Sequence, residues 1–295
     1  MAAATRIHAL LEKERTLIFP GVYDALGAKL VERAGFPLTF ISGYSVAATQ
    51  LGLPDFGYLT QTEMVATAKR VCGSVTIPII IDADTGYGNA LNVIRTVNEL
   101  IDAGAAGMFL EDQVWPKRCG HMKGKRVIPV EEHVQKIRAA ADARRGRDFF
   151  IVARTDARQV NGLEDAIKRC RRYKEAGADA LFVEAPRSTE ELATIARELP
   201  PPLVANMLEG GVTPLLAKDE LEKLGLQLVV CPLTALYASA KAMQDMFALI
   251  KTKGTTREAL DRLLPFQQFH DIIGLDDYYK LDEKYKTPGE DTGSH

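Results

Sequence analysis

The chain has 295 residues, of which 46% are hydrophobic and 26% charged, and its formal net charge is −2. Because no basic block or strongly acidic tail is present, this composition argues against nucleic acid or an anionic membrane as the main partner. No segment has the layout of a secretory signal, and no apolar run approaches the ~20 residues of a membrane-spanning helix. The four cysteines are scattered along the chain, which predicts a reducing compartment, the cytosol.

Eight short runs rich in β-branched residues alternate with helical patterns. The runs that contain the predicted strands are residues 16–21, 38–45, 77–89, 106–113, 149–157, 179–186, 202–211 and 226–233. The predicted helices are residues 24–36, 60–73, 90–105, 130–145, 162–178, 189–199, 214–225 and 234–254. Eight strand-then-helix units favour a closed (β/α)₈ TIM barrel over an open doubly wound sheet, and no GxGxxG motif follows the first strand.

A further amphipathic segment, residues 266–285, is rich in Phe and Tyr. It is expected either to cover the bottom of the barrel or to form a subunit contact. Residues 1–295 are therefore predicted to form one barrel domain with a C-terminal helical extension over about residues 255–285 and a frayed tail.

Polar residues stand at the ends of nearly all predicted strands, where barrel enzymes carry their catalytic groups. Asp82 and Asp84 lie two apart on one strand and project to the same face, and Glu111 ends the next strand. Three oxygen donors without a neighbouring His or thiolate suit Mg²⁺, which Mn²⁺ can replace, better than zinc. The structural alternative is a cluster of helix-capping aspartates.

A second motif, residues 115–121 (WPKRCGH), lies in the long loop after the fourth strand. Cys119 is flanked by Lys117, Arg118 and His121, a positive field that is expected to lower the thiol pKa. No nucleophile elbow or triad order accompanies it, so we predict a proton donor. The alternative is a buried, inert cysteine. Gly120 and Gly124 would allow the loop to move over bound substrate.

A third motif, residues 152–157 (VARTDA), places Arg154 at a strand end. Its guanidinium is suited to grip a substrate carboxylate, although an Arg–Asp surface pair is the competing interpretation. The backbone amides of residues 42–45 are expected to hold a second carboxylate.

At residues 82–89, 110–121, 152–158 and 206–211 the sequence resembles the isocitrate lyase/phosphoenolpyruvate mutase superfamily. The resemblance runs from about Phe19 to the final helix, and KRCGH is typical of the lyase branch. It implies dimers that exchange their last helices and assemble into homotetramers. It also implies Mg²⁺ held directly by Asp84 and, largely through water, by Asp82 and Glu111.

The resemblance further implies the roles of the other site residues. Cys119 would be the acid. In the mechanism that follows, Lys117, Arg118 and His121 stabilise the departing enolate, and Tyr44 is our candidate for the group that handles the hydroxyl proton. The candidate substrate-binding residues are Ser42, Gly43, Asp55, Gly120, Arg154, Glu184, Asn206, Leu208 and Pro232.

Two positions bear on the substrate. Leu208 stands where isocitrate and 2-methylisocitrate lyases carry a hydroxyl residue, and Pro232 where oxaloacetate hydrolases have Ser. The chain thus resembles the alkylmalate lyases, 2,3-dimethylmalate lyase above all, which yields pyruvate and propionate. 2-Methylisocitrate lyase and oxaloacetate hydrolase are the alternatives. A phosphonate mutase would not need the thiol, and a non-catalytic barrel would be expected to lose Cys119 or the acidic triplet.

Overall fold

The computed structural model describes residues 5–122 and 124–287. Its eight strands are all parallel and form a closed barrel in which each strand pairs with the next and β8 pairs with β1. The strands are β1 (Leu17–Val22), β2 (Thr39–Ile41), β3 (Ile79–Asp82), β4 (Gly107–Glu111), β5 (Phe150–Thr155), β6 (Ala180–Val183), β7 (Leu203–Asn206) and β8 (Leu228–Cys231). The predicted (β/α)₈ TIM barrel is confirmed.

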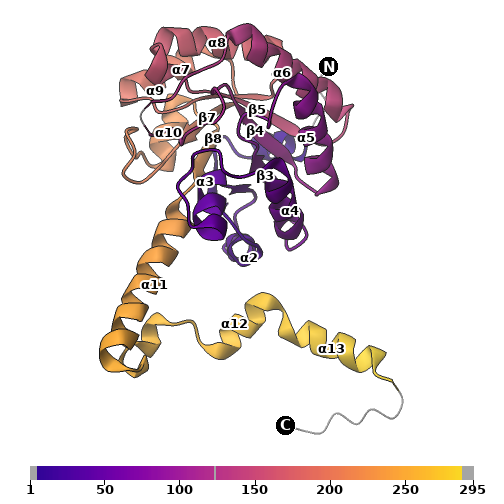
Figure 1. The fold of residues 1–295 in the computed structure, drawn as a ribbon, viewed down its shortest axis with the longest axis vertical. Coiled ribbons are helices and arrows are strands. Elements are labelled where there is room, and N and C mark those ends of the chain that lie inside the picture. Colours follow the sequence, from indigo (N-terminus) through magenta and orange to yellow (C-terminus); the bar gives the residue numbers. More distant parts are fainter. Residues whose placement is uncertain (1–4, 123, 288–295) are drawn as a thin grey trace. The chain divides into compact units, whose positions relative to one another are not determined.

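Helices follow the strands and lie around the outside of the barrel (Figure 1). The helices that the sequence predicts are α2 (Ala25–Arg33), α4 (Gln61–Cys72), α5 (Ala90–Asp102), α6 (Val130–Arg144), α8 (Leu163–Glu175), α9 (Thr189–Glu198), α10 (Lys218–Leu224) and α11 (Thr234–Lys253). Three shorter helices, α3 (Gly43–Val46), η1 (Ala47–Leu51) and α7 (Ala157–Val160), lie in loops after strands. None of the helices in the described part of the chain is long and apolar enough to span a membrane.

Two hydrophobic clusters form the core. The larger lies between the strands and the surrounding helices, and the smaller fills the inside of the barrel. The inner cluster includes one layer from alternate strands, which is the usual packing inside a TIM barrel. The members of this layer are Phe40, Phe109, Phe182 and Val230 from β2, β4, β6 and β8.

An N-terminal helix that the sequence analysis missed, α1 (Arg6–Lys13), packs against the inner cluster. Ile7 is fully buried in this cluster, and Leu10 and Leu11 pack against it. Thr5 begins the helix as N-cap and accepts a hydrogen bond from the backbone of His8. The apolar spacing of i, i+3 and i+4 together with the Thr N-cap was a readable signal for this helix.

The chain divides into two compact units, Met1–Ser239 and Ala240–His295. The second unit begins within α11, earlier than the predicted extension at about residue 255. It also contains η2 (Arg257–Arg262), α12 (Phe266–Ile273) and α13 (Leu275–Tyr285). The single helical segment predicted over 266–285 is wrong in one respect, because Gly274 adopts a left-handed conformation with φ of +75° and separates α12 from α13.

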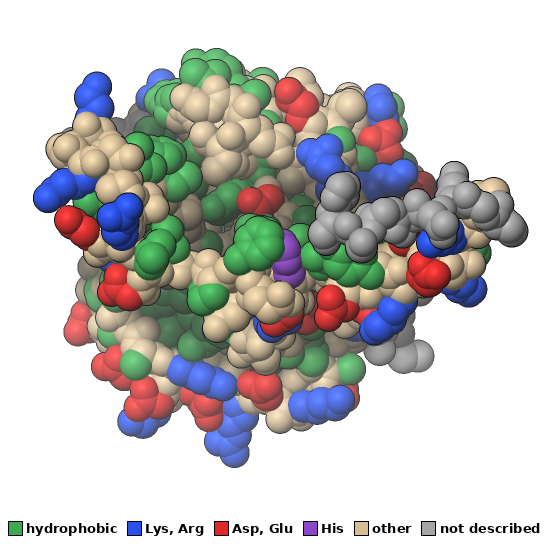
Figure 2. Space-filling model, turned by 90° about the horizontal axis from the view of Figure 1, so that it is seen from below, with side chains coloured by type: hydrophobic (Ala, Val, Ile, Leu, Met, Phe, Trp, Pro, Cys, Tyr) green, Lys and Arg blue, Asp and Glu red, His purple; other side chains and the backbone are tan. Residues whose placement is uncertain are grey.

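Charged side chains of both signs are interspersed on the face seen in Figure 2, without a large single-sign field. This distribution agrees with the formal net charge of −2.

Candidate active site

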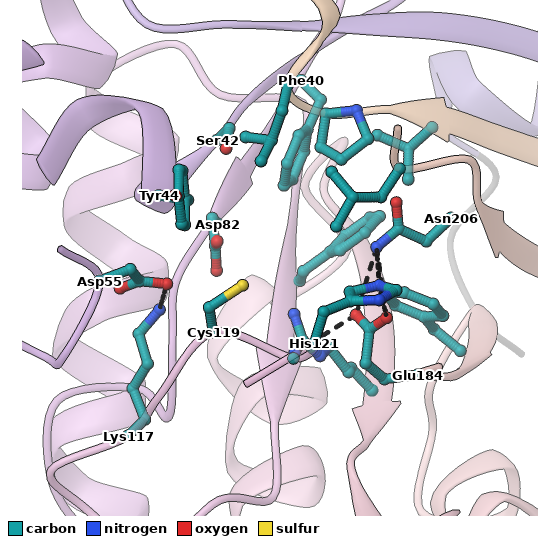
Figure 3. Close-up of a pocket in the computed structure, with 18 residues that line it drawn as sticks. Phe40, Ser42, Tyr44, Asp55, Asp82, Lys117, Cys119, His121, Glu184 and Asn206 are labelled. Carbon is teal, nitrogen blue, oxygen red and sulfur yellow. Dashed lines mark hydrogen bonds and ion pairs between the residues drawn. The ribbon is translucent and has the colours of Figure 1, made fainter. Parts of the chain in front are cut away.

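A cavity lies at the carboxyl ends of the strands and contains most of the predicted site residues (Figure 3). It encloses about 480 Å³ of empty space, its mouth included. The predicted residues that line it are Ser42, Tyr44, Asp55, Asp82, Lys117, Cys119, Gly120, His121, Arg154, Glu184, Asn206, Leu208 and Pro232. Gly43, Asp84, Glu111 and Arg118 do not line it directly. The inner layer of Phe40, Phe109, Phe182 and Val230, which the sequence analysis did not single out, contributes apolar lining.

The two arms of the loop that carries Cys119 are joined to each other at its base. Val114 N donates to Arg126 O at 2.8 Å, and Gln113 pairs with Val127 in an isolated β-bridge. Cys119 N donates to Asp55 O at 3.2 Å. In Figure 3 the thiol lies between the Asp55–Lys117 pair on one side and His121, Glu184 and Asn206 on the other. The loop therefore delivers the sulfur to the cavity.

The expectation of a lowered thiol pKa at Cys119 is wrong. Burial, together with the carboxylates of Asp55 and Glu184, raises the pKa of Cys119 to about 11. The neighbouring cations do not supply the expected positive field, because Lys117 and His121 pair with carboxylates and the guanidinium of Arg118 lies over the Phe56 ring. The thiol is therefore protonated at neutral pH.

Lys117 is buried between two carboxylates. Its Nζ lies 2.7 Å from Asp55 Oδ2 and 2.6 Å from Asp84 Oδ1. These carboxylates hold the pKa of Lys117 well above its ordinary value against the opposing effect of burial. The pairing joins the Cys119 loop to the end of β3.

His121 forms a second polar cluster with Glu184 and Asn206. Its Nε2 lies 3.0 Å from Glu184 Oε1, and its Nδ1 accepts from Val212 N at 3.2 Å, which assigns the proton to Nε2. Asn206 Nδ2 donates to Glu184 Oε1 at 3.2 Å, so the amide oxygen of Asn206 is the atom left for another donor. Arg154 and His121 hold the pKa of Glu184 far below its usual range.

Arg154 is enclosed by carboxylates rather than exposed at the surface. Its Nε and Nη2 donate to Asp156 at 3.0 and 3.1 Å, and Nη2 also lies 3.2 Å from Glu111 and 3.3 Å from Glu184. The guanidinium carbon lies 5.5 Å from the centre of the Phe182 ring. The alternative of a surface Arg–Asp pair is wrong, since the side chain of Arg154 is only 12% exposed.

The backbone of residues 42–45 is largely occupied by contacts within the protein. Ser42 N donates to Val22 O, Gly43 N donates to Asp82 Oδ2 at 3.2 Å, and Ser45 N donates to Ser42 Oγ at 3.3 Å. The expectation that these amides jointly hold a substrate carboxylate is wrong for those three groups. Gly43 instead allows a close approach, because a Cβ there would lie 2.9 Å from Asp82 Oδ2.

The three predicted metal ligands lie at the carboxyl ends of two neighbouring strands. Asp82 is the last residue of β3, Asp84 is the second residue after it, and Glu111 is the last residue of β4. Asp84 has φ of +47°, a left-handed conformation that non-glycine residues rarely adopt and that is frequent at functional sites. Its backbone N donates to Asp82 Oδ1 at 3.1 Å. The described residues contain no cluster of three or more His, Cys, Asp or Glu side chains arranged as direct metal ligands. Direct ligation by one carboxylate, with the others acting through water, does not need such a cluster.

Carboxylates outnumber cations around the cavity. The carboxylates are Asp55, Asp82, Asp84, Glu111, Asp156 and Glu184, and the cations that pair with them are Lys117, Lys125 and Arg154. Burial raises the pKa of Asp84 to about 7 and that of Glu111 well above its ordinary value. Glu111 Oε1 is buried and has no hydrogen-bond partner among the described residues. A divalent cation would offset this surplus of negative charge, so the donor set fits Mg²⁺.

Comparison with known proteins places the chain in a family. A family model described as phosphoenolpyruvate phosphomutase matches residues 7–251. The chloroplastic carboxyvinyl-carboxyphosphonate phosphorylmutase of Arabidopsis thaliana is 54% identical over 95% of this chain and 84% of its own length. The petal death protein of Dianthus caryophyllus is 50% identical over 96% of this chain and 89% of its own. The 2,3-dimethylmalate lyase of Eubacterium barkeri is 44% identical over 97% of this chain and 99% of its own.

Solved structures agree with these relatives. A 2,3-dimethylmalate lyase described as a PEP mutase/isocitrate lyase superfamily member superposes with a TM-score of 0.91 at 35% identity, covering 100% of this chain and 99% of that chain. Oxaloacetate acetylhydrolase with 3,3-difluorooxalacetate gives 0.90 at 33% identity, covering 97% of each. Phosphonopyruvate hydrolase, solved with oxalate and Mg²⁺, gives 0.85 at 28% identity, covering 96% and 100%.

Relatives named as lyases cover nearly the whole chain, which confirms the expectation of a lyase-type enzyme. The family expectation is confirmed as well. On sequence and fold together, the chain belongs to the phosphoenolpyruvate mutase/isocitrate lyase superfamily.

Proposed function

We propose that the chain is a Mg²⁺-dependent carbon–carbon lyase that cleaves an alkylmalate, 2,3-dimethylmalate foremost, to pyruvate and a carboxylic acid such as propionate. The observation that carries this proposal is a half-buried, protonated thiol, Cys119, in a cavity that also contains Arg154 and the apolar side chains of Leu208, Pro232 and Leu233. A thiol of this kind suits the protonation of a carbanion-like carbon.

Each cavity residue has a role in this reaction. Cys119 keeps its proton until the bond between C2 and C3 breaks and then gives it to the departing carbon. Tyr44 is our candidate for the group that handles the hydroxyl proton on C2, since it lines the same cavity. Arg154, with Glu184 and Asn206 around it, orients a carboxylate of the substrate. Ser42, Asp55 and Gly120 shape the walls, and Gly43 lets Asp82 approach the backbone closely.

Polar side chains of the Cys119 loop stabilise the negative charge that develops on the departing fragment. Lys117 and His121 lie in the cavity wall, whereas Arg118 lies outside it, so we assign the stabilisation to the ammonium group of Lys117 and to the Nε2–H of a neutral His121 acting as a hydrogen-bond donor. The backbone N of Arg118 donates to Gln113 Oε1 at 3.0 Å, a contact that holds the loop independently of the side chain at this position.

Mg²⁺ would be held by Asp84, with Asp82 and Glu111 acting largely through water. When bound, it would neutralise the carboxylate and the 2-oxygen of the substrate. The surplus of negative charge around the cavity supports this assignment, because a dianionic substrate would otherwise be repelled by the carboxylates.

Leu208 and Pro232 support an alkylmalate over the two alternative substrates. Leu208 is buried and lines the cavity, so a third carboxylate beside it would be desolvated without a partner, at a cost of several kcal/mol. A methyl group there is favoured, each buried CH₂ contributing ~0.8 kcal/mol. Pro232 has no donor to offer a hydrated ketone.

A substrate panel tests this proposal. We expect kcat/KM for 2,3-dimethylmalate to exceed that for 2-methylisocitrate and for oxaloacetate, by at least roughly tenfold, because unpaired buried polar groups discriminate strongly. Pyruvate release and oxalate release are measured with Mg²⁺ present, and phosphonopyruvate is included. A preference for 2-methylisocitrate would contradict the argument from Leu208, and rapid oxalate production would contradict that from Pro232. Turnover of phosphonopyruvate alone would assign the chain to a phosphonate reaction.

We infer that the enzyme works as a homotetramer of helix-exchanged dimers in the cytosol. Large apolar side chains of the second unit are exposed in the single chain, among them Phe266 at 78% and Tyr285 at 72%, which supports association with other copies. The four free cysteines support a reducing compartment.

A further inference from the structure

Lys125 is a buried cation that none of the roles above uses. It lies in the loop that carries Cys119, and its side chain has no exposed surface. Its Nζ donates to Asp156 Oδ1 at 2.6 Å and to the carbonyl oxygen of Gly120. One ammonium group therefore connects the loop to the residue that follows β5.

The Gly120 carbonyl belongs to the residue directly after Cys119. Gly120 packs so closely against the barrel that a Cβ would overlap the Arg154 guanidinium and lie 2.6 Å from Glu184 Cδ. A small displacement of this carbonyl would move the Cys119 backbone by a similar amount. The position of the thiol is thus tied to the hydrogen bond from Lys125.

The other acceptor, Asp156, extends the connection to Arg154. Asp156 is fully buried, and both of its carboxylate oxygens accept from the Arg154 guanidinium. Arg154 and Lys125 together hold the pKa of Asp156 below its ordinary value. A single carboxylate therefore fixes the relative positions of the thiol-bearing loop and the guanidinium.

We propose that Lys125 is a positioning residue that holds Cys119 in the cavity and in register with Arg154, through the Gly120 carbonyl and Asp156. The proposal rests on the proposed function only for the role of Cys119 as acid. The part of the proposal that concerns the position of the loop depends only on the buried contacts of Lys125. Charge-assisted hydrogen bonds of this kind are the strong ones in proteins.

The test uses Lys125→Met in the full chain, which keeps the side-chain length and leaves Asp156 paired with Arg154. The rate of alkylation by iodoacetamide is measured at each cysteine by peptide mass spectrometry. We expect the rate at Cys119 to rise by about tenfold or more, since a hydrogen bond to a charged group is lost. Cys72 and Cys231, which are partly exposed and lie outside the loop, are internal controls that keep their rates.

Two further variants sharpen the result. Lys168→Met removes an exposed lysine that pairs with Glu164 four residues away, and it is expected to leave all alkylation rates unchanged. In a double-mutant cycle, Lys125→Met and Asp156→Asn are expected to have effects on the Cys119 rate that are clearly not additive, because they remove the same contact.

The outcomes separate this proposal from the proposed function. A folded Lys125→Met protein in which Cys119 reacts no faster overturns the positioning role. An equal rise at all three cysteines also overturns it, because that pattern reports general loosening. If Cys119 alone becomes reactive while the wild-type protein cleaves no alkylmalate, the positioning role is supported and the proposed function is not.

Discussion

The protonation state of Cys119 is set by groups that are distant in the sequence rather than by the residues beside it in the chain. Burial and the carboxylates of Asp55 and Glu184 all favour the neutral thiol, and they outweigh the opposing effects of the His121 backbone hydrogen bond and of Arg154. A general acid must carry its proton when the carbanion forms, and the neutral thiol meets this requirement. A nucleophile would need the opposite shift. The environment therefore favours a proton donor over a nucleophile.

The first prediction concerns this residue. Cys119→Ser is expected to lower kcat by ~10²–10⁴-fold, because a hydroxyl is a much weaker acid than a thiol. Binding of oxalate in the presence of Mg²⁺, measured by calorimetry, is expected to change little. Cys72→Ser serves as the control, since Cys72 lies at the end of α4 and away from the cavity lining. A Cys119→Ser enzyme that keeps more than a tenth of the wild-type rate would show that Cys119 is not the acid.

At the scale of the helices and strands, the second prediction concerns the packing of α1 against the inside of the barrel. Ile7 of α1 has no exposed surface and belongs to the cluster inside the barrel. Ile7→Ala is expected to lower the free energy of unfolding by about 2–5 kcal/mol, through lost burial and the cavity left behind. Urea denaturation measures this change, and kcat per folded molecule is expected to stay the same.

The control for this variant is Leu91→Ala, because Leu91 is 73% exposed at the start of α5. Surface substitutions of this kind typically change stability by less than about 0.5 kcal/mol. Equal destabilisation by the two variants would contradict the assignment of α1 to the core.

The sequence predicted the repeated elements well, because their signals are local. Every predicted strand and outer helix is present, and the strand ends carry Asp82, Glu111 and Arg154 where expected. Contacts between distant residues are not visible in a local pattern. Lys117 pairs with Asp55, 62 residues away, and Lys125 with Asp156, 31 residues away. The error in the pKa of Cys119 followed from this, since its cationic neighbours were assumed to be unpaired.

For the molecule as a whole, the excess of carboxylates around the cavity leads us to expect that activity depends on a divalent metal ion. With carboxylates in excess over Lys117, Lys125 and Arg154, we expect EDTA to abolish activity and Mg²⁺ or Mn²⁺ to restore it, with zinc a poor substitute. Mg²⁺ is also expected to raise Tm in the absence of substrate, because it binds only the folded protein.

Asp84→Asn is the informative variant in this experiment. It removes a carboxylate that is almost fully buried, and it is expected to abolish the Mg²⁺-dependent rise in Tm. Asp219→Asn, on the exposed helix α10, is expected to leave that rise intact. Full activity in a preparation shown to be free of metal would contradict the metal assignment and the mechanism built on it.

The assembly of several chains is the last prediction. The second unit exposes Phe247, Leu260, Phe266, Tyr278 and Tyr285 to solvent, each by more than 60% in the single chain. Several large apolar side chains exposed on one part of a protein typically mark a surface that binds another protein. Light scattering after size-exclusion chromatography is expected to give a mass about four times the 32.4 kDa of one chain.

The double variant Phe266→Asp with Tyr278→Asp is expected to reduce this mass, because a charge buried without a partner is unfavourable in an interface. Leu91→Asp changes an equally exposed residue of the first unit and is expected to leave the mass unchanged. A wild-type chain that elutes as a monomer would contradict the association, and it would leave the barrel and the cavity residues of the first unit as they are.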